Sequence, residues 1–333
     1  MRVPVVALIR LAHERCTAAG PKRPHETTKA YPRAMPRHSS VVAVLVGSTA
    51  LAMASLEPAA AHGIRSAVDG GLMLWTLDPF GAAVLALFAG VYARGQLRLA
   101  RRSHGERGTR AACFWAGWIA LALALGPPLE ALTPVSFAAH MTQHEIMMLA
   151  AAPLLVIARP LGTLLWGLPQ SFAVVVKAAA VRRAAAWLSG PLVAWLTHAA
   201  VLWGWHVPVA FEAGLRSEPV HWLQHLSFFL AAVIFWWSVF SGDRSGARRG
   251  IALVSVFTTA IHTTVLGALL TFSTSVWYAT YAAAAPAWGL SAIEDQQLGG
   301  LIMWVPGGMV FLAAGLSLAA LWLRASELRA ARG

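Results

Sequence analysis

The sequence predicts an all-α fold, a polytopic membrane helix bundle with about seven transmembrane helices that follow a cleavable signal-like segment. Hydrophobic residues make up 58% of the 333 positions and charged residues only 12%, whereas about a quarter of the residues of a soluble domain are charged. Runs of 18 or more nearly uncharged residues recur along the chain, which is the signature of transmembrane helices. Lysine and arginine also gather in alternate loops between these runs, as they do in proteins that cross a bilayer repeatedly.

The N-terminal part divides into a leader and a signal-like segment. Residues 1–34 are rich in Pro, Arg and Lys, and Met35 is a second candidate start, so this leader is of doubtful translation. Residues 35–61 combine a basic start, an apolar stretch and a final small-residue site of A-x-A type, the pattern of a cleaved signal peptide. Cleavage there would place His62 at the start of a membrane domain of residues 62–333. The alternative is an uncleaved segment that forms an eighth span.

Seven apolar runs follow, and each is long enough to cross a bilayer as a helix. Their predicted bounds are 78–95, 111–128, 138–158, 190–207, 220–241, 251–272 and 298–323. The loops on one side of these spans carry 16 Lys and Arg residues, and the loops on the other side carry only Arg65 and Arg216. By the positive-inside rule, the N-terminus of the mature chain is periplasmic and the C-terminus is cytoplasmic.

The segment 159–189 interrupts this alternation. It is moderately apolar, but it contains two prolines and four basic residues. A helix with that charge pattern is expected to lie along a membrane surface rather than to cross the bilayer. We therefore predict an interfacial cytoplasmic segment, on the same side as the other basic loops.

Several classes of partner and chemistry are not expected. The net charge of +12 is divided among short loops beside the spans and the leader, so topology accounts for it and no nucleic-acid partner is predicted. No phosphate-binding G-x-x-x-x-G-K-[ST] motif occurs and no loop is long enough for a nucleotide domain, so no nucleotide is predicted. The two cysteines, Cys16 and Cys113, form no C-x-x-C motif, which argues against metal transfer by paired thiolates.

Five histidines fall at one depth, near the outer ends of three predicted spans. His140 and His144 begin the third span, His206 ends the fourth, and His221 and His225 begin the fifth. A spacing of four residues puts both members of a pair on one helix face, with Cβ atoms roughly 5–6 Å apart. Two such faces turned toward each other would supply four imidazoles, which are common ligands of copper, zinc and haem iron. The alternative is that each is an amphipathic side chain tolerated at the interface.

The two histidine pairs share a sequence pattern. The segments HMTQH and HWLQH, 81 residues apart, agree at both His and at Gln, which suggests an internal repeat.

Other neighbouring residues favour copper among these metals. Met147 and Met148 follow His144 at i+3 and i+4, so one or both continue its face, and a thioether beside imidazoles favours Cu(I) over zinc. A methionine pair in a membrane can also be ordinary packing. A mature N-terminus at His62 would add an α-amine beside an imidazole, a chelate for Cu(II).

Three acids lie at the outer ends of predicted spans, where an unpaired carboxylate is costly. Asp78 begins the first span, Glu145 follows His144, and Asp295 begins the last. A carboxylate beside a metal-binding histidine can orient its second nitrogen. We therefore predict that these acids support the histidines or dock a partner.

Three stretches together resemble a known family. They are HMTQHEIMMLAAAPLLVIARPL (140–161), WHVPVAFEAGLRSEPVHWLQHLSFFLAAVIFWW (205–237) and EDQQLGGLIMWVPGGMVFL (294–312). They are similar to the CtaG family of membrane proteins needed to assemble cytochrome c oxidase, and the resemblance covers roughly residues 62–323. This family is distinct from the cysteine-bearing copper chaperones that share a similar name. The motif positions are occupied here by His140, His144, His206, His221, His225, Asp295 and Gln296.

The resemblance implies a multi-pass assembly factor of a bacterial-type inner (plasma) membrane, with cytochrome c oxidase subunits and the lipid bilayer as partners. The leading hypothesis is that it binds or delivers copper at the periplasmic face through the motif histidines, with no reaction catalysed. One alternative is a haem-binding membrane redox protein with histidines as axial ligands. A copper transporter is another, with His198 and His262 as deeper steps. The last is a metal-free docking scaffold.

Overall fold

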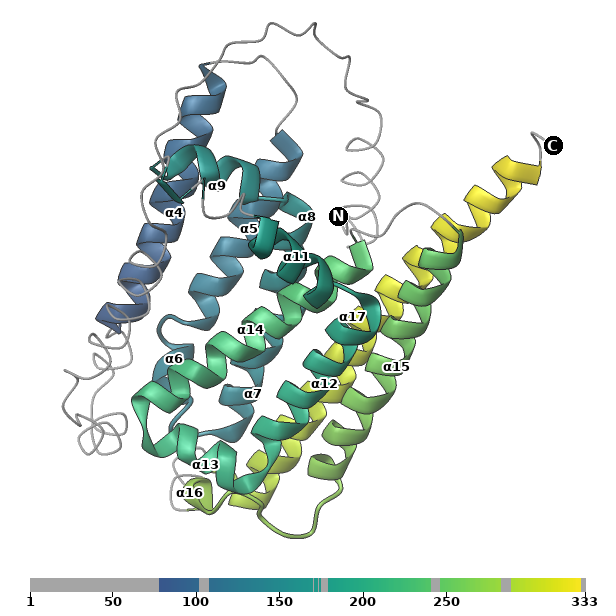
Figure 1. Cartoon of the computed structure of the whole chain (residues 1–333). Helices are drawn as coiled ribbons and strands as arrows, with labels where there is room; N and C mark the ends of the chain where they lie inside the picture. Colours follow the sequence, from purple (N-terminus) through teal and green to yellow (C-terminus); the bar gives the residue numbers. More distant parts are fainter. Residues whose placement is uncertain are drawn as a thin grey trace, which may run out of the picture. The chain divides into compact units, whose positions relative to one another are not determined.

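The computed structural model describes residues 78–101, 108–169, 171–172, 174, 179–240, 246–282 and 289–330, all of which belong to the unit His62–Gly333. The predicted leader, the signal-like segment and His62 lie outside the described residues. Within the described part every regular element is helical (Figure 1). In chain order these elements are α4 (Pro79–Ala100), α5 (Gly108–Ala124), α6 (Leu129–Leu132), α7 (Phe137–Glu145), the π-helix η3 (Ile146–Ala151), α8 (Ala152–Ala158), α9 (Leu161–Gly167), α11 (Ala179–Leu188), α12 (Pro191–His206), α13 (Pro208–Arg216), α14 (Glu218–Phe240), α15 (Gly246–Thr271), α16 (Ala279–Ala282) and α17 (Ala292–Ala330).

The predicted membrane bundle is confirmed by the length and composition of these helices. Six segments of the described part are long and apolar enough to cross a membrane: Pro79–Ala100, Gly108–Leu132, Phe137–Ala158, Glu218–Phe240, Arg248–Thr271 and Ala292–Glu327. A seventh is obtained if α11 and α12 count as one broken span, although the two helices meet at 72°. Six of the seven predicted spans therefore overlap one of these segments, and the fourth overlaps the α12 part of the broken pair.

The fourth predicted span, 190–207, corresponds to α12 and is the shortest. Its 16 residues extend about 24 Å at 1.5 Å per residue, less than the roughly 30 Å thickness of a hydrocarbon core. The preceding segment 159–189 contains α9 and α11. Its interfacial placement stays a prediction.

The helix ends that carry the motif histidines meet at one end of the bundle. α7 and α14 both begin at this end, α12 ends there, and the short helices α13 and α16 lie beside them at the bottom of Figure 1. We call this end, at the first turns of α7 and α14, the histidine end. The main apolar core is formed between these helices and includes Phe228, Phe235 and Trp236 of α14, each almost wholly buried.

The span that carries the first histidine pair is not a uniform α-helix. The π-helix η3 joins α7 to α8 and begins directly after Glu145. α7 packs on α17, whereas η3 and α8 pack on α5 and α14. A π-helical turn is rare and is frequently found at functional sites. The two halves of this span therefore face different neighbours.

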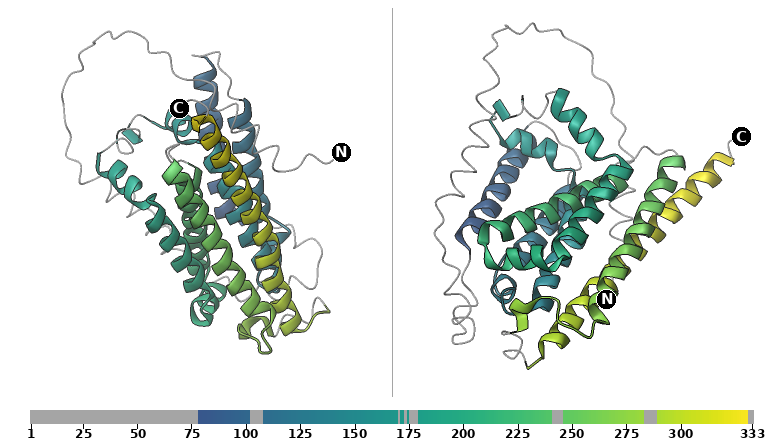
Figure 2. Two further views of the ribbon diagram at one scale, coloured as in Figure 1. Left: turned by 90° about the vertical axis from the view of Figure 1, so that its right-hand side faces the viewer. Right: turned by 60° about the horizontal axis from the view of Figure 1, so that its bottom comes forward.

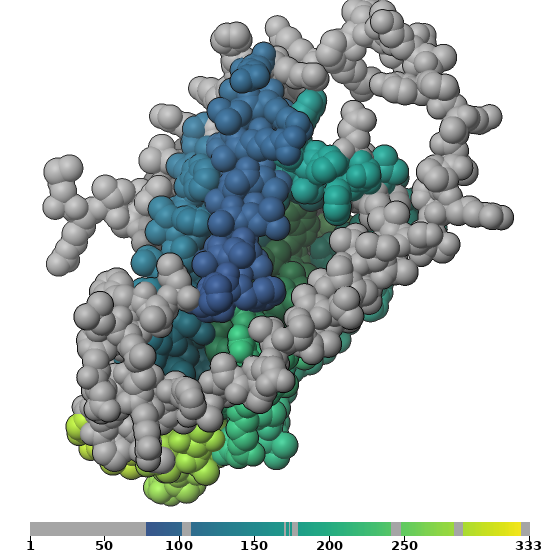
Figure 3. All heavy atoms as spheres, turned by 90° about the vertical axis from the view of Figure 1, so that its left-hand side faces the viewer, coloured from purple at the N-terminus to yellow at the C-terminus, as the bar shows by residue number. Residues whose placement is uncertain are grey.

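Away from the histidine end, the C-terminal half of α4 packs on α9 (Figure 3). Gly95 and Gly167 make this close approach possible, because a Cβ at either position would overlap a backbone oxygen of the other helix. Near its start, α4 is connected to α5 by a hydrogen bond from Trp118 Nε1 to the Leu85 carbonyl at 3.0 Å.

α15 and α17 run side by side, as both views of Figure 2 show. Small residues permit their backbones to touch, as is common between membrane helices. A Cβ at Gly300 would lie 2.6 Å from the backbone nitrogen of Thr271 and 2.7 Å from the carbonyl oxygen of Gly267. Gly308, two turns further along α17, has open space where a Cβ would stand.

Gly300→Ala is expected to lower the stability of the protein in detergent, because the added methyl would push α15 and α17 apart. Overpacking of this kind typically costs about 1–3 kcal/mol. Gly308→Ala is the matched control on the same helix and should unfold at the wild-type temperature or above it. Thermal unfolding of the two purified variants would measure the difference, and equal midpoints would contradict the close approach.

Candidate metal centre

The two predicted histidine pairs lie against each other at the histidine end. The ring centroid of His140 lies 5.3 Å from that of His221 and 5.9 Å from that of His225. The rings of His144 and His225 are 5.2 Å apart. Within the pairs, the centroids are 4.5 Å apart on α7 and 4.0 Å apart on α14. Four imidazoles therefore form one cluster, because the i, i+4 spacing places each pair on the face that meets the other helix.

Three of these histidines are arranged as a possible metal site. Each of His140, His221 and His225 offers a ring nitrogen, and these nitrogens all lie within 4.8 Å of one another. His140 and His225 are buried, and His221 is partly exposed. A buried set of imidazoles with one exposed member combines protection of an ion with a path for its entry. We call these three residues the histidine triad.

A tyrosine that the sequence did not single out fixes the protonation of His140. The Tyr281 hydroxyl donates to the Thr133 carbonyl at 2.9 Å and lies 2.9 Å from Nδ1 of His140. Burial raises the pKa of Tyr281 well above its ordinary value, and Asp295 raises it further, so the hydroxyl keeps its proton. Because that single proton goes to Thr133, the hydroxyl accepts from Nδ1–H of His140. The Nε2 atom of His140 is then left with a lone pair, as a metal ligand requires.

His144 contacts the triad from α7, the helix that also carries His140. Its Nε2 lies 3.1 Å from Nε2 of His140. Since Nε2 of His140 carries the lone pair, His144 donates in this hydrogen bond and its own Nδ1 is unprotonated. That Nδ1 is buried and has no hydrogen-bond partner in the described part of the chain. In this state His144 occupies the Nε2 lone pair of His140 with a hydrogen bond that a metal ion would replace, and it holds a second lone pair on its own Nδ1.

His206 lies nearby, at the end of α12, with its own lone pair. Its Nδ1 donates to the Leu202 carbonyl at 2.7 Å, which leaves Nε2 unprotonated. This Nε2 is buried and has no partner among the described residues. His206 interacts electrostatically with His140 and His144. The structure therefore brings His206 to the cluster without making it a member of the triad.

The two predicted methionine ligands lie in apolar clusters. Met148 belongs to the main core, where its backbone carbonyl accepts from Trp236 Nε1 at 2.9 Å. Met147 packs in a separate cluster with Leu85 and Leu121 of α4 and α5. Both residues lie in η3, so the α-helical i+3 and i+4 spacing from His144 no longer describes their direction. A copper-binding role for them stays a prediction.

Asp295 anchors the helix that carries the first histidine pair. Its carboxylate accepts from the Ser136 hydroxyl at 2.7 Å, from the backbone N–H of Phe137 at 2.6 Å and from that of Ala138 at 3.3 Å. These N–H groups belong to the first turn of α7 and have no partner within that helix. The acid is almost wholly buried. Asp295 therefore ties α17 to the start of α7.

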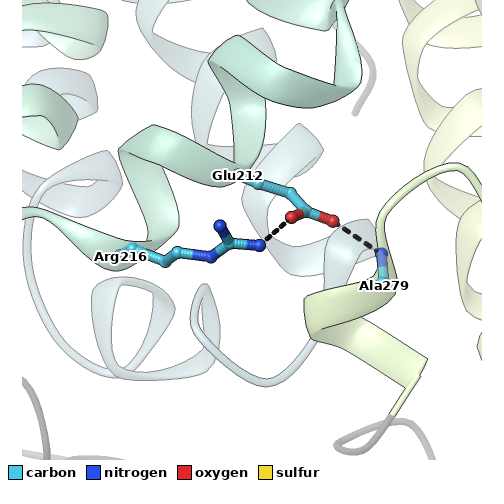
Figure 4. A network of polar contacts seen from close by, with 3 residues as sticks. All are labelled: Glu212, Arg216 and Ala279. Atoms are coloured by element: carbon cyan, nitrogen blue, oxygen red, sulfur yellow. Dashed lines mark hydrogen bonds and ion pairs between the residues drawn. The ribbon is translucent and has the colours of Figure 1, made fainter.

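Gln296 and Glu212 hold the loop that carries Tyr281. The Gln296 side chain accepts from the Trp277 N–H at 2.6 Å and donates to the Ser275 carbonyl at 3.1 Å. Glu212 of α13 accepts from the Ala279 N–H at 2.9 Å (Figure 4).

Glu212 also forms an ion pair with Arg216 one turn along the same helix. Tyr278, on the same loop as Tyr281, donates to the His206 carbonyl at 3.0 Å. The loop is thus connected to α12, α13 and α17 in the stretch that leads to Tyr281.

The other two predicted acids, Asp78 and Glu145, form no hydrogen bond to a cluster histidine in the described part of the chain. Asp78 caps α4, accepting from the N–H groups of Phe80 at 3.2 Å and Gly81 at 2.6 Å, and it interacts electrostatically with His221. The Glu145 side chain lies against α17, where a Cβ at Gly307 would stand 3.1 Å from its Oε2. That oxygen is buried and has no hydrogen-bond partner in the described residues.

The glutamines of the two H-x-x-Q-H segments are both wholly buried. Gln143 donates to the Ala124 carbonyl at 2.9 Å and to the Glu130 carboxylate, and so connects α7 to the end of α5 and to α6. Gln224 lies against Gly214 of α13, where a Cβ would come within 3.0 Å of its Oε1. Gln143 thus joins α7 to α5 and α6, whereas the Gln224 amide packs against α13 with no hydrogen-bond partner among the described residues.

The sequence of the chain matches a protein family and two curated relatives. The model of the family described as "Cytochrome c oxidase caa3 assembly factor (Caa3_CtaG)" matches residues 90–325, which include every residue of the cluster. Two curated relatives, uncharacterized proteins of Mycobacterium bovis and Mycobacterium tuberculosis, are each 26% identical over 273 residues, which is 78% of this chain. The chain spans 41% of the length of each of these relatives. No solved structure matches the chain significantly.

Proposed function

Since the chain belongs to the family of cytochrome c oxidase caa3 assembly factors, we propose that this multi-pass membrane protein binds copper at its histidine triad and delivers it to oxidase subunits. The observation that carries the proposal is the buried triad of His140, His221 and His225, whose ring nitrogens lie within 4.8 Å of one another. Copper is cargo in this proposal, and the protein acts by binding and release without catalysing a reaction.

The residues present fit a copper ion. Imidazole nitrogen suits copper as well as zinc, and the family's role in oxidase assembly favours copper. Tyr281 holds His140 in the tautomer whose Nε2 carries the lone pair, and a copper ion would take this lone pair in place of the hydrogen bond from His144. The buried Nε2 atoms of His225 and His206 have no hydrogen-bond partner in the described part of the chain. His221 is the partly exposed member of the triad. We propose that copper enters and leaves the site past this residue.

The proposal is tested by complementation of cells that lack the gene. Cells that carry His221→Ala should make normal amounts of oxidase polypeptide that lacks copper and activity. The control is Leu223→Ala, an exposed neighbour on α14, which should restore the active oxidase. A fully active oxidase in cells with well-expressed His221→Ala would contradict copper delivery. Haem absorption bands in the purified protein would contradict the choice of copper.

Tyr281→Phe is expected to weaken copper binding by about ten- to a hundredfold, the usual cost of removing a group that orients a metal-binding histidine. Without the hydroxyl, Nδ1–H of His140 loses its acceptor. Tyr278→Phe is the matched control, because its hydroxyl donates to a backbone carbonyl and does not touch a triad ring. Competition with a copper chelator would measure both affinities. Equal affinities in the two variants would refute the orienting role of Tyr281.

We also propose that the histidine end faces the periplasm and the C-terminus the cytoplasm, because the basic loops lie on the opposite side of the spans. Reporter fusions after Arg183 and Arg249 should be cytoplasmic, and fusions near Thr133 and Ser217 should be periplasmic. A periplasmic reporter at Arg183 would overturn both this orientation and the interfacial placement of 159–189.

A further inference from the structure

A second group of polar side chains lies deeper in the bundle, between α12 and α15. The rings of His198 and His262 are 5.8 Å apart, and the indole of Trp195 is 5.8 Å from His262. His198 precedes His206 by eight residues on α12, which corresponds to about 12 Å along the helix axis. Thr259 lies one turn from His262 on α15. This group therefore occupies a different depth and a different helix pair from the triad.

The polar atoms of this group have no partners in the described part of the chain. They are Nδ1 of His198, both ring nitrogens of His262, Nε1 of Trp195 and Oγ1 of Thr259, and all are buried. His198 is 2% exposed and Thr259 is fully buried. An unpaired polar group costs free energy in an apolar interior, and within a membrane such groups usually mark a ligand or ion path. Two facing imidazoles with unused lone pairs are suited to bind a metal ion.

We propose that His198 and His262 bind a second ion, and that this ion is Cu(I). The charge of the surroundings decides between metals. Neither imidazole has a carboxylate among its electrostatic partners, and neither α12 nor α15 contains an Asp or Glu. The cost of moving an ion into a low-dielectric interior rises with the square of its charge, so a divalent ion costs about four times as much as a monovalent one.

Ligand number leads to the same ion. A structural zinc site requires four ligands, whereas this group offers two imidazoles and no thiolate or carboxylate. The ring of Phe235 packs at 5.0 Å from that of His198 and closes the side toward α14. Cu(I) has the lower charge and accepts a small set of nitrogen ligands. The site does not depend on the triad, so the full chain should hold two copper ions.

The test is an oxygen-free titration of the purified full-length protein with Cu(I) supplied by a coloured chelator. The wild type should bind two ions, and His262→Leu and His221→Ala should each bind one fewer. The double variant should bind none. If His262→Leu binds as many ions as the wild type, the deeper site is overturned. If His262→Leu loses an ion and His221→Ala does not, the deeper site stands and the triad proposal fails.

A second measurement places the ion beside α12 and does not depend on removing a ligand. Trp195 is a neighbour of the pair and not a ligand, so Trp195→Phe should still bind two ions. Filling of the deeper site should quench the fluorescence of Trp195, and this part of the quenching should disappear in Trp195→Phe. The same quenching should be absent in His262→Leu. Identical quenching in all three proteins would overturn the placement.

Discussion

His225→Ala is expected to abolish copper binding at the histidine triad, so that the purified protein retains one ion fewer than the wild type and keeps only the ion between His198 and His262. It removes one of the three ring nitrogens that lie within 4.8 Å of one another, and with it a ligand of the triad ion. The loss of affinity should exceed the ten- to hundredfold range that is typical for groups that only support a ligand. Metal analysis after copper supplementation and chelator competition would measure it. Leu226→Ala, the exposed neighbour on α14, should retain copper as the wild type does.

His144→Ala tests whether the whole cluster acts as one site. Its ring lies against those of His140 and His225, and its buried Nδ1 has no hydrogen-bond partner in the described residues. It can therefore offer the ion a further lone pair, and its loss should also reduce retention. The double variant His144→Ala, His225→Ala should be no worse than His225→Ala alone, because effects at residues that share one site do not add. A well-expressed double variant that supports a fully active oxidase would remove the metal hypothesis and favour a docking scaffold.

Asp295→Ala is expected to destabilise the folded protein more than Gly300→Ala does. The buried carboxylate accepts three hydrogen bonds, two of them from the first backbone N–H groups of α7. Its removal leaves those donors buried and unpaired, and a hydrogen bond to a charged group contributes about 1.5–3 kcal/mol. We therefore expect a loss of about 3 kcal/mol or more, measured as reduced recovery of folded protein after detergent extraction and a lower unfolding temperature.

Glu294→Ala is the matched control for this substitution. The adjacent acid is exposed and accepts from the backbone N–H and the hydroxyl of Ser291, both at 2.7 Å. It forms no side-chain hydrogen bond to a histidine-bearing helix among the described residues. The protein should therefore unfold close to the wild-type temperature. Equal destabilisation by the two substitutions would show that Asp295 does not anchor α7.

Much of the fold could be predicted because its determinants are local. Most of the transmembrane helices are long apolar runs, and the i, i+4 spacing fixes the shared face of His140 and His144 without any knowledge of neighbours. The weakest prediction concerned α12, whose 16 residues are apolar enough but too short to cross alone. There the bend at Gly190, between α11 and α12, depends on packing that composition does not encode.

The surroundings of the histidines could not be predicted in the same way. Tyr281 is 141 residues from His140 in the chain, and Asp295 is 158 residues from Phe137. Only tertiary packing brings such residues together. The sequence did indicate that a buried acid needs partners, but not that these would be the first turn of another helix. A tyrosine in the loop before the last span was the available signal for the orienting group.

The π-helical turn η3 can also be understood as the product of a single-residue insertion. In an α-helix each residue turns the chain by about 100°, so one extra residue rotates everything beyond it by that angle. α7 is thereby free to present its histidines to α14 while packing on α17, and α8 is rotated to pack on α5 and α14. Deletion of one residue between Ile146 and Ala151 would restore a regular helix in which only one half could keep its present neighbours. The length of this segment, and not only its composition, is therefore under structural constraint.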